Sequence, residues 1–366
     1  VPAGERGPLH GIPVGVKDII DTADLPTEYG SPIYTGHRPA NDAEVVSRLR
    51  AAGAVIVGKT VTTEFALFRA GPTTNPHDSS RTPGGSSSGS AAAVGARTIP
   101  LALGTQTAGS IVRPGSFCGV VGVKPTFGAI PTGGVKPCSQ SLDTVGIFTG
   151  DVAGAARVLP ILTGMPPVGV SEHDPVRVGF ARTPEWDRIP GPTRAILEQG
   201  AALVADELDV VEVNLPFAGL AEAQTVVMQV EATRALAVER ERHAEQLSEI
   251  LRDVLRTGDR LAWAYQAARD FVDQCRARLP EIFAGVDVLL APSVLGEAPL
   301  LAHGTGDPLL CRAWTALGTP AVSVPGLTGP SGLPLGMQVI GAPGRDGTAL
   351  AAAHRISRLL ESNRAV

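Results

Sequence analysis

The sequence predicts an α/β fold: a single domain with a central mixed β-sheet covered by helices on both faces. Two observations favour this fold class. Near the start of the chain, an apolar strand, an amphipathic helix and a second apolar strand follow one another, which is the order of a parallel β–α–β unit. Short apolar runs typical of buried strands then alternate with helical patterns along the rest of the chain. With no internal repeat and no evident boundary, residues 1–366 are expected to form one domain.

The first unit follows from its residue pattern. Residues 11–17 form an apolar run that ends in Lys17 and predicts a buried strand. Asp42 can cap the helix that follows, and Gly53 stands where a C-terminal glycine belongs. Residues 54–58 then predict a second short buried strand. This order places Lys17 at the end of a strand inside the sheet.

The rest of the chain divides into an unusual stretch and an ordinary one. Between Gly71 and Gly150 it is dense in Gly, Ser, Thr and Pro, with short apolar runs at 100–104 and 120–123. Such small residues predict close backbone approach around a site. After Gly150, apolar runs and helical periodicity give a conventional series of elements. The predicted strands are 176–180, 210–213, 286–290, 320–325 and 335–340, and the predicted helices are 192–208, 217–240, 259–279 and 347–361.

Composition excludes several classes of function. The chain carries 31 Lys and Arg against 36 Asp and Glu, a net charge of -5, and has no block of basic residues. Nucleic-acid binding is therefore not expected. No apolar stretch reaches the roughly 18 residues that a membrane helix needs. No secretory signal opens the chain, so a cytoplasmic protein is the expectation.

Metal and disulfide chemistry are also not expected. The four cysteines are widely spaced and include no C-x-x-C pair, and the seven histidines show no metal-ligand spacing. Free and mostly buried thiols are the simplest interpretation. We single out Cys138 because it follows the serine-rich region discussed next.

Two serine-containing stretches, 83–93 and 104–110, indicate chemistry. A serine is a poor nucleophile until a base takes its proton. The small residues before Ser110 allow backbone N–H groups to converge into an oxyanion hole, in which one donor is worth about 3 kcal/mol of barrier. Serine hydroxyls from Ser86 onward could pass the proton. Lys17 is the candidate base, because burial at a strand end favours its neutral form.

Three other interpretations of these stretches remain open at this point. Gly/Ser runs are commonly flexible turns. A Gly-rich loop that opens a helix can bind phosphate, but no lysine follows these glycines as the P-loop pattern requires. Residues 85–89 formally match G-x-S-x-G with Ser87 at the centre, but the α/β-hydrolase elbow needs a preceding strand, and a polar, proline-broken segment stands there instead.

Taken together, these motifs resemble the amidase signature family. The resemblance covers essentially the whole chain, and residues 84–126 form its signature core. Ser86 and Ser110 are 24 positions apart, which is the separation that the family's two serines keep. The segments that carry the resemblance are 17–18, 84–93, 104–114, 119–126, 141–146 and 334–341.

The resemblance implies a Ser–cis-Ser–Lys triad and no metal or organic cofactor. Lys17 would be the base, Ser86 the bridging serine on a cis peptide after Gly85, and Ser110 the nucleophile. Ser87 would lie beside the substrate and orient the network. The implied oxyanion hole consists of the backbone N–H groups of Thr107, Ala108, Gly109 and Ser110.

The chain departs from the commonest signature at three positions. Gln106 replaces the usual Asp, Ala108 replaces a usual Gly, and Arg113 stands one place later than the usual arginine. This form resembles malonamidases, in which the corresponding arginine binds a substrate carboxylate. The alternative for Arg113 is a structural ion pair. The family also has an N-terminal helical region before the lysine strand, so we expect residues that precede this chain.

The expected function is hydrolysis of a carboxylic acid amide to the acid and ammonia or an amine, through an acyl-serine. A small, carboxylate-bearing amide of the malonamate type is the favoured substrate. The alternatives are a partner-dependent amidotransferase component that releases ammonia, a broad-specificity amidase or esterase, and a non-catalytic binding protein. By analogy with the family, a homodimer is expected.

Overall fold

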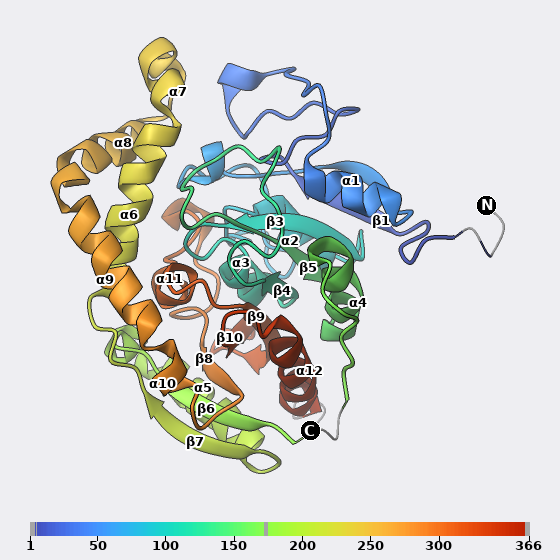
Figure 1. Ribbon diagram of the computed structural model, residues 1–366, viewed down its shortest axis with the longest axis vertical. Helices are drawn as coiled ribbons and strands as arrows, with labels where there is room; N and C mark the ends of the chain where they lie inside the picture. The colour runs from blue at the N-terminus through green and yellow to red at the C-terminus, as the bar shows by residue number, and fades with distance from the viewer. Residues whose placement is uncertain (1–3, 5, 172–174, 363–366) are drawn as a thin grey trace.

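The computed structural model describes residues 4, 6–171 and 175–362. Within these ranges, ten strands form one sheet in the order β2-β1-β3-β5-β4-β9-β10-β8-β6-β7 (Figure 1). The strands are β1 (Pro13–Lys17), β2 (Val55–Thr60), β3 (Leu101–Gln106), β4 (Val121–Lys124), β5 (Thr144–Thr149), β6 (Arg177–Arg182), β7 (Asp209–Asn214), β8 (Val288–Pro292), β9 (Ala321–Thr328) and β10 (Pro334–Gly341).

The sheet is mixed, as the sequence predicts. Both ends are parallel, because β1 pairs with β2 and β3, and β6 pairs with β7 and β8. The centre, from β3 through β5, β4, β9 and β10 to β8, is antiparallel. Since β1 and β3 are parallel neighbours, both end at the same edge of the sheet, and the site lies there.

Helices cover both faces of the sheet. In β10, Val339 belongs to one buried cluster and Ile340 to another, as the alternation of a strand requires. The first cluster includes residues of α1, α4, α5 and α12, and the second includes residues of α6, α9 and α11. Figure 1 shows α6, α8 and α9 as a column along one side of the molecule. The helices are α1 (Glu44–Ala51), α2 (Ser88–Gly95), α3 (Val112–Cys118), α4 (Val152–Thr163), α5 (Gly191–Ala205), α6 (Leu220–Ala235), α7 (Ala237–Arg242), α8 (Glu249–Leu261), α9 (Tyr265–Ala277), α10 (Leu279–Ile282), α11 (Leu309–Ala316) and α12 (Asp346–Ser362).

The expected elements are present, with three differences. The helix expected over 217–240 is divided at Leu236 into α6 and α7, and the one expected over 259–279 is divided between α8 and α9. The structure also contains β5, α3, α4, α11 and the part of α8 before residue 259, which the sequence patterns do not indicate. Strand β5 is wholly buried and therefore shows no alternation, while α4 contains Pro160, a residue that usually breaks a helix.

The proposed cap of α1 is wrong. The N-cap residue is Ala43, and the Asp42 carboxylate instead accepts a hydrogen bond from the backbone N–H of Ala23 and pairs with Arg50. The expected C-terminal glycine is confirmed, because Gly53 has a φ of +89° just after the helix.

The small residues between 71 and 150 allow the close backbone approach that the sequence predicts. A Cβ atom at Gly89, in the first turn of α2, would lie 2.3 Å from the backbone nitrogen of Val61. Gly84 has a φ of +83°, and a Cβ there would lie 2.9 Å from the Cα of Pro114. Helix α2 thus packs close to the chain after β2, and the loop before it packs close to α3.

Candidate active site

Strand β1 carries Lys17 to the edge of the sheet at which β3 also ends. Lys17 is fully buried, and its Nζ donates hydrogen bonds to the hydroxyl oxygens of Ser86 and Thr105, each at 2.7 Å. Burial lowers the pKa of Lys17 from its usual 10.5 to about 7, although the nearby Asp143 raises it. The expectation that burial favours neutral Lys17 is therefore confirmed.

Ser86 lies in the loop that leads into α2. A cis peptide bond joins Gly85 to Ser86, at the position that the resemblance implies. The backbone on both sides of this bond is held in place. The Gly85 carbonyl accepts a hydrogen bond from Arg113 Nη2 at 2.6 Å, and the Ser86 carbonyl accepts one from the Thr63 N–H at 3.2 Å. The hydroxyl of Ser86 is thereby fixed against Lys17.

The turn between β3 and α3, residues 107–110, is buried, and the carbonyl groups of its first three residues are held by neighbouring groups. Each of these carbonyls accepts one hydrogen bond, so the backbone of the turn is fixed. The donors are the side-chain amide of Gln224 for Thr107 at 2.8 Å, the hydroxyl of Thr315 for Ala108 at 2.7 Å and the backbone N–H of Arg113 for Gly109 at 2.9 Å.

The backbone N–H groups of the same turn differ from its carbonyl groups in their hydrogen bonding. Within the described part of the chain, none of the backbone N–H groups of Thr107, Ala108, Gly109 and Ser110 donates a hydrogen bond. Buried backbone N–H groups are rarely left without a partner. Four consecutive ones in a fixed turn can bind an oxygen atom that carries negative charge.

Gln106, the last residue of β3, shapes this turn. Its Oε1 accepts hydrogen bonds from the N–H groups of Ile111 and Val112, at 2.8 and 3.0 Å. These groups belong to the start of α3 and would otherwise lack acceptors. Its Nε2 donates to the Thr315 hydroxyl at 2.9 Å. Gln106 therefore caps α3 from within the preceding strand.

One small cavity brings the predicted residues together. Ser86, Ser110 and Arg113 all line it. Among the described residues, the hydrogen bond within the predicted triad is that between Lys17 and Ser86, and Ser110 shares the cavity with Ser86. The remaining wall is formed by Thr63, Ala66, Leu67, Phe68, Thr107, Ala108, Met228, Thr305 and Pro308.

Arg113 is bound to neutral groups. It is only 4% exposed, and its guanidinium donates to the carbonyl oxygens of Gly306 at 2.5 Å and Gly85 at 2.6 Å, and to the hydroxyl of Thr305 at 3.3 Å. Its Nε has no partner in the described part of the chain. Arg113 forms no ion pair with any described carboxylate, and the nearby Asp307 acts on it only through its charge, so the described residues give no support to a structural ion pair.

Ser87 does not line the cavity. It is fully buried, and its hydroxyl donates to the Thr105 carbonyl at 3.2 Å and lies 3.3 Å from the Thr105 N–H, which donates to it. Ser87 therefore fixes the backbone of strand β3 at Thr105, outside the cavity. This contact fits the expectation that Ser87 orients the network and gives no support to a contact with substrate.

Sequence reasoning missed three polar residues that hold the site: Thr105, Gln224 and Asp143. Asp143 accepts hydrogen bonds from the Thr107 hydroxyl at 2.6 Å and from the N–H groups of Cys138 at 2.8 Å and Ser139 at 2.9 Å. Asp143 could have been found from the sequence, because it lies in segment 141–146, one of the segments that carry the family resemblance. Gln224 lies in the middle of α6, where no local pattern marks it.

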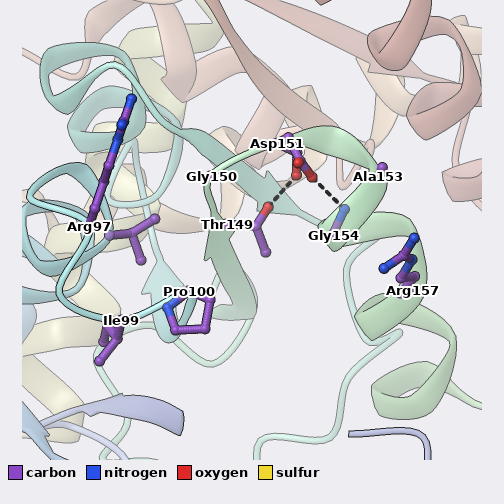
Figure 2. Close-up of a pocket in the computed structure, with 10 residues that line it drawn as sticks. Arg97, Ile99, Pro100, Thr149, Gly150, Asp151, Ala153, Gly154 and Arg157 are labelled. Carbon is purple, nitrogen blue, oxygen red and sulfur yellow. Dashed lines mark hydrogen bonds between the residues drawn. The ribbon is translucent and has the colours of Figure 1, made fainter. Parts of the chain in front are cut away.

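A wider hollow lies away from these residues, between the end of α2 and the start of α4 (Figure 2). Arg97 and Arg157 stand on opposite sides of it. The Asp151 carboxylate occupies the helix start, where it accepts a hydrogen bond from the Gly154 N–H at 2.6 Å. None of the predicted site residues lines this hollow.

The described ranges of the chain contain no group of three or more His, Cys, Asp or Glu side chains that could hold a metal ion. None of their helices is long and apolar enough to cross a membrane.

Comparison with known proteins identifies the family. A model of the amidase family matches residues 2–350. The chain belongs to the amidase family. It is accordingly an enzyme that hydrolyses C–N bonds of amides.

Relatives of this amidase include one component of the glutamyl-tRNA(Gln) amidotransferase of Anaeromyxobacter dehalogenans (strain 2CP-C). The two are 37% identical, over 97% of this chain and 84% of the relative. Similar solved structures include a crystal structure of an amidase, with a TM-score of 0.88 and 33% identity over 98% of this chain and 86% of that one. A peptide amidase in complex with the competitive inhibitor chymostatin has a TM-score of 0.80 and 32% identity, over 96% and 84%.

These likenesses confirm the predicted α/β fold of the amidase. The finer resemblance to malonamidases is not among them and stays a prediction.

Proposed function

We propose that this amidase hydrolyses small amides through an acyl-serine, with Ser110 as nucleophile and with Ser86 and Lys17 relaying the proton. The observation that carries the proposal is the buried hydrogen bond of 2.7 Å between Lys17 and Ser86, beside a cavity that Ser110 also lines. A serine needs a base, and a lysine whose pKa is about 7 can act as one near neutral pH.

The proposed cycle begins when Ser110 Oγ attacks the amide carbonyl carbon. The Ser110 proton passes to Ser86 while the Ser86 proton passes to neutral Lys17. The carbonyl oxygen takes the negative charge and binds to the N–H groups of residues 107–110, each such donor lowering the barrier by about 3 kcal/mol. The relay then returns the proton to the leaving nitrogen and the C–N bond breaks. Water, deprotonated by the same relay, attacks the acyl-Ser110 carbonyl and releases the acid.

We further propose that Arg113 gives a preference for an amide that carries a carboxylate, as malonamate does. Arg113 lines the cavity, is almost fully buried and has an unpartnered Nε. No acidic side chain of the described residues lines this cavity. A substrate carboxylate would therefore satisfy a free N–H and lie next to a buried cation that forms no ion pair with a described carboxylate, although the charge of the nearby Asp307 acts on it.

A second candidate is a partner-dependent amidotransferase component. The observation that favours it is the 37% identity to one component of a glutamyl-tRNA(Gln) amidotransferase. An enzyme of this kind would release ammonia from its amide donor poorly until a partner protein is present. A broad-specificity amidase or esterase is the third candidate, because an acyl-serine forms from esters as well as amides.

The discriminating experiment is ammonia release from malonamic acid, malonamide, an aliphatic monoamide and glutamine, with an aryl ester followed by its alcohol. A strong preference of the isolated chain for malonamic acid supports the proposed carboxylate-bearing substrate. Equal turnover of the neutral amides and the ester indicates broad specificity. Poor turnover of every compound supports the partner-dependent candidate.

Two variants with matched controls assign the residues. Ser110→Ala should abolish turnover, whereas Ser88→Ala should not, because Ser88 bonds to the Val61 carbonyl and lies outside the cavity. Arg113→Ala should lose the preference for the acid-bearing amide. Arg81→Ala is its control, since Arg81 also donates to a backbone carbonyl, that of Ala298, but its Nε pairs with Asp78 at 3.4 Å and it does not line the cavity.

Arg113 also holds the Gly85 carbonyl, so its loss can slow every substrate. The ratio of kcat/KM for malonamic acid to that for malonamide separates the two effects. A ratio unchanged in Arg113→Ala would show that Arg113 only holds the backbone.

A further inference from the structure

Asp143 is a titratable group close to the site that the proposed cycle does not use. It stands just before β5, and its side chain is partly covered. One carboxylate oxygen accepts from the Thr107 hydroxyl, and the other from the N–H groups of Cys138 and Ser139. Asp143 therefore ties the turn of unpaired N–H groups to the loop before β5.

The same carboxylate faces the lysine side of the site. Asp143 lines a small cavity together with Thr105 and Thr107, and Thr105 is the residue whose hydroxyl accepts a hydrogen bond from Lys17. Asp143 also lines a second, wider cavity, along with Gln140 and Phe127. Asp143 thus stands between the surroundings of Lys17 and a hollow lined by surface residues.

The charged groups that act on Lys17 are few. Asp143 and Cys138 are the two whose charge raises the pKa of Lys17. Burial raises the pKa of the Cys138 thiol, so this thiol is neutral at ordinary pH. Lys136 also lines the small cavity but is paired with Glu239 at 2.6 Å. Asp143 is consequently the negative group left to balance Lys17.

We propose that Asp143 is a positioning residue of the reaction: it is the counter-charge for Lys17 when the relay has protonated that lysine, and it fixes Thr107 in the oxyanion turn. The inference rests on the proposed function, because it needs Lys17 to be the base. When Ser110 attacks, Lys17 gains a proton in a fully buried place. The nearby Asp143 carboxylate stabilises that ammonium, and its hydrogen bond from Thr107 keeps the turn in position at the same moment.

The counter-charge carries a cost in the resting enzyme. A nearby negative charge favours protonated Lys17, while the base must be neutral. Burial also raises the pKa of Asp143, to about 6. Above that pH the carboxylate is charged, and kcat/KM should rise with pH as Lys17 loses its proton.

The test compares the pH dependence of kcat/KM on one small amide in the parent and in Asp143→Asn. The acid limb is the part of the profile in which kcat/KM falls as the pH is lowered. Removing the Asp143 charge should move this limb about one pH unit lower and reduce kcat/KM on the plateau above it. A merely structural role would reduce the rate and leave the limb in place. Asp346→Asn is the matched control, because the Asp346 carboxylate also accepts from a backbone N–H and a hydroxyl, both of Thr126, away from Lys17. Its limb should not move.

Thr107→Val provides the second variant in case Asp143→Asn does not fold. Loss of the Thr107 hydrogen bond raises the pKa of Asp143, so less negative charge faces Lys17 and the limb should move in the same direction by a smaller amount. An acid limb that stays at the same pH in every folded variant would overturn the role of Asp143 and leave the proposed function standing. A parent without an acid limb, or an active Ser110→Ala, would instead overturn the proposed function.

Discussion

Lys17 occupies a position in which an ammonium group is costly. It is fully buried, its two closest partners are hydroxyl groups, and burial brings its pKa to about 7. A serine hydroxyl can lose its proton to such an amine only while the amine is neutral. The chemistry of the site is therefore set by one residue whose protonation changes near neutral pH.

A pH profile follows from this residue. In the proposed mechanism neutral Lys17 is the active form, so kcat/KM should fall as the pH drops below an apparent pKa of about 7 and be level above it. The measurement is the initial rate on one amide from about pH 5 to 9, after stability over that range has been checked. A profile that falls as pH rises through neutrality would assign the limb to another group.

At this scale the sequence predicted three side chains that the structure brings to one site and missed those that hold them. Lys17, Ser86 and Ser110 could be assigned because the family's motifs name them. Gln224 acts from α6 on Thr107, 117 positions away in the chain, and no local pattern reports such a contact. Arg113 likewise donates to the Gly306 carbonyl, 193 positions away, and no local pattern reports that contact either.

Among the elements, α3 depends on the strand before it. Its first N–H groups bond to the Gln106 side chain. Gln106→Leu should lower the free energy of unfolding by about 2 kcal/mol, because it leaves buried donors without acceptors. It should also reduce kcat, since the turn that holds Ser110 loses its anchor. Urea unfolding measures the first effect, with Gln140→Leu, at an exposed position, as the control. Equal stabilities of the two variants would contradict this role.

Helix α2 depends on the absence of a side chain at Gly89. A Cβ there would lie 2.3 Å from the backbone nitrogen of Val61, so Gly89→Ala should destabilise the fold by about 1–3 kcal/mol and displace the segment that carries Ser86. Gly58→Ala is the matched control, because nothing lies within 4 Å of the added Cβ. Thermal unfolding and kcat would be measured for both. A neutral Gly89→Ala would refute the close approach.

Some helix boundaries and one strand could not be predicted from sequence patterns. The order of the residues predicted the β–α–β unit and most strands, because short apolar runs of this kind are typical of buried strands. The two long helices were each predicted as one because periodicity continues across their breaks; Leu236, with φ of -101° and ψ of 24°, interrupts the first. Strand β5 stayed hidden since both of its faces are buried and no alternation marks it.

For the whole molecule, a buried lysine links function to stability. The pKa of Lys17 is about 7 in the folded state and near 10.5 when unfolded. Between these values the unfolded chain binds one more proton, so the Lys17 contribution to stability rises as pH increases from about 7 toward 10. Lys17→Met should remove this dependence. The difference in the free energy of unfolding between the variant and the parent should therefore shrink by about 2 kcal/mol between about pH 7 and 9.

Urea unfolding of the parent and Lys17→Met at several pH values checks this linkage. The comparison isolates Lys17 from Lys124 and Lys59, whose pKa values burial also lowers. A difference in stability that does not change with pH would place the pKa of Lys17 near its usual value. The expected homodimer stays a prediction, for which sedimentation velocity is the direct measurement.

In the proposed mechanism Ser110 forms the acyl-enzyme. The most direct test is to quench the enzyme during turnover of a slow aryl ester, digest it and locate the acyl group by mass spectrometry, with Ser110→Ala in parallel. An added acyl mass is expected on Ser110 in the parent and none in the variant. An acyl group on another residue, or continued turnover by Ser110→Ala, would contradict it.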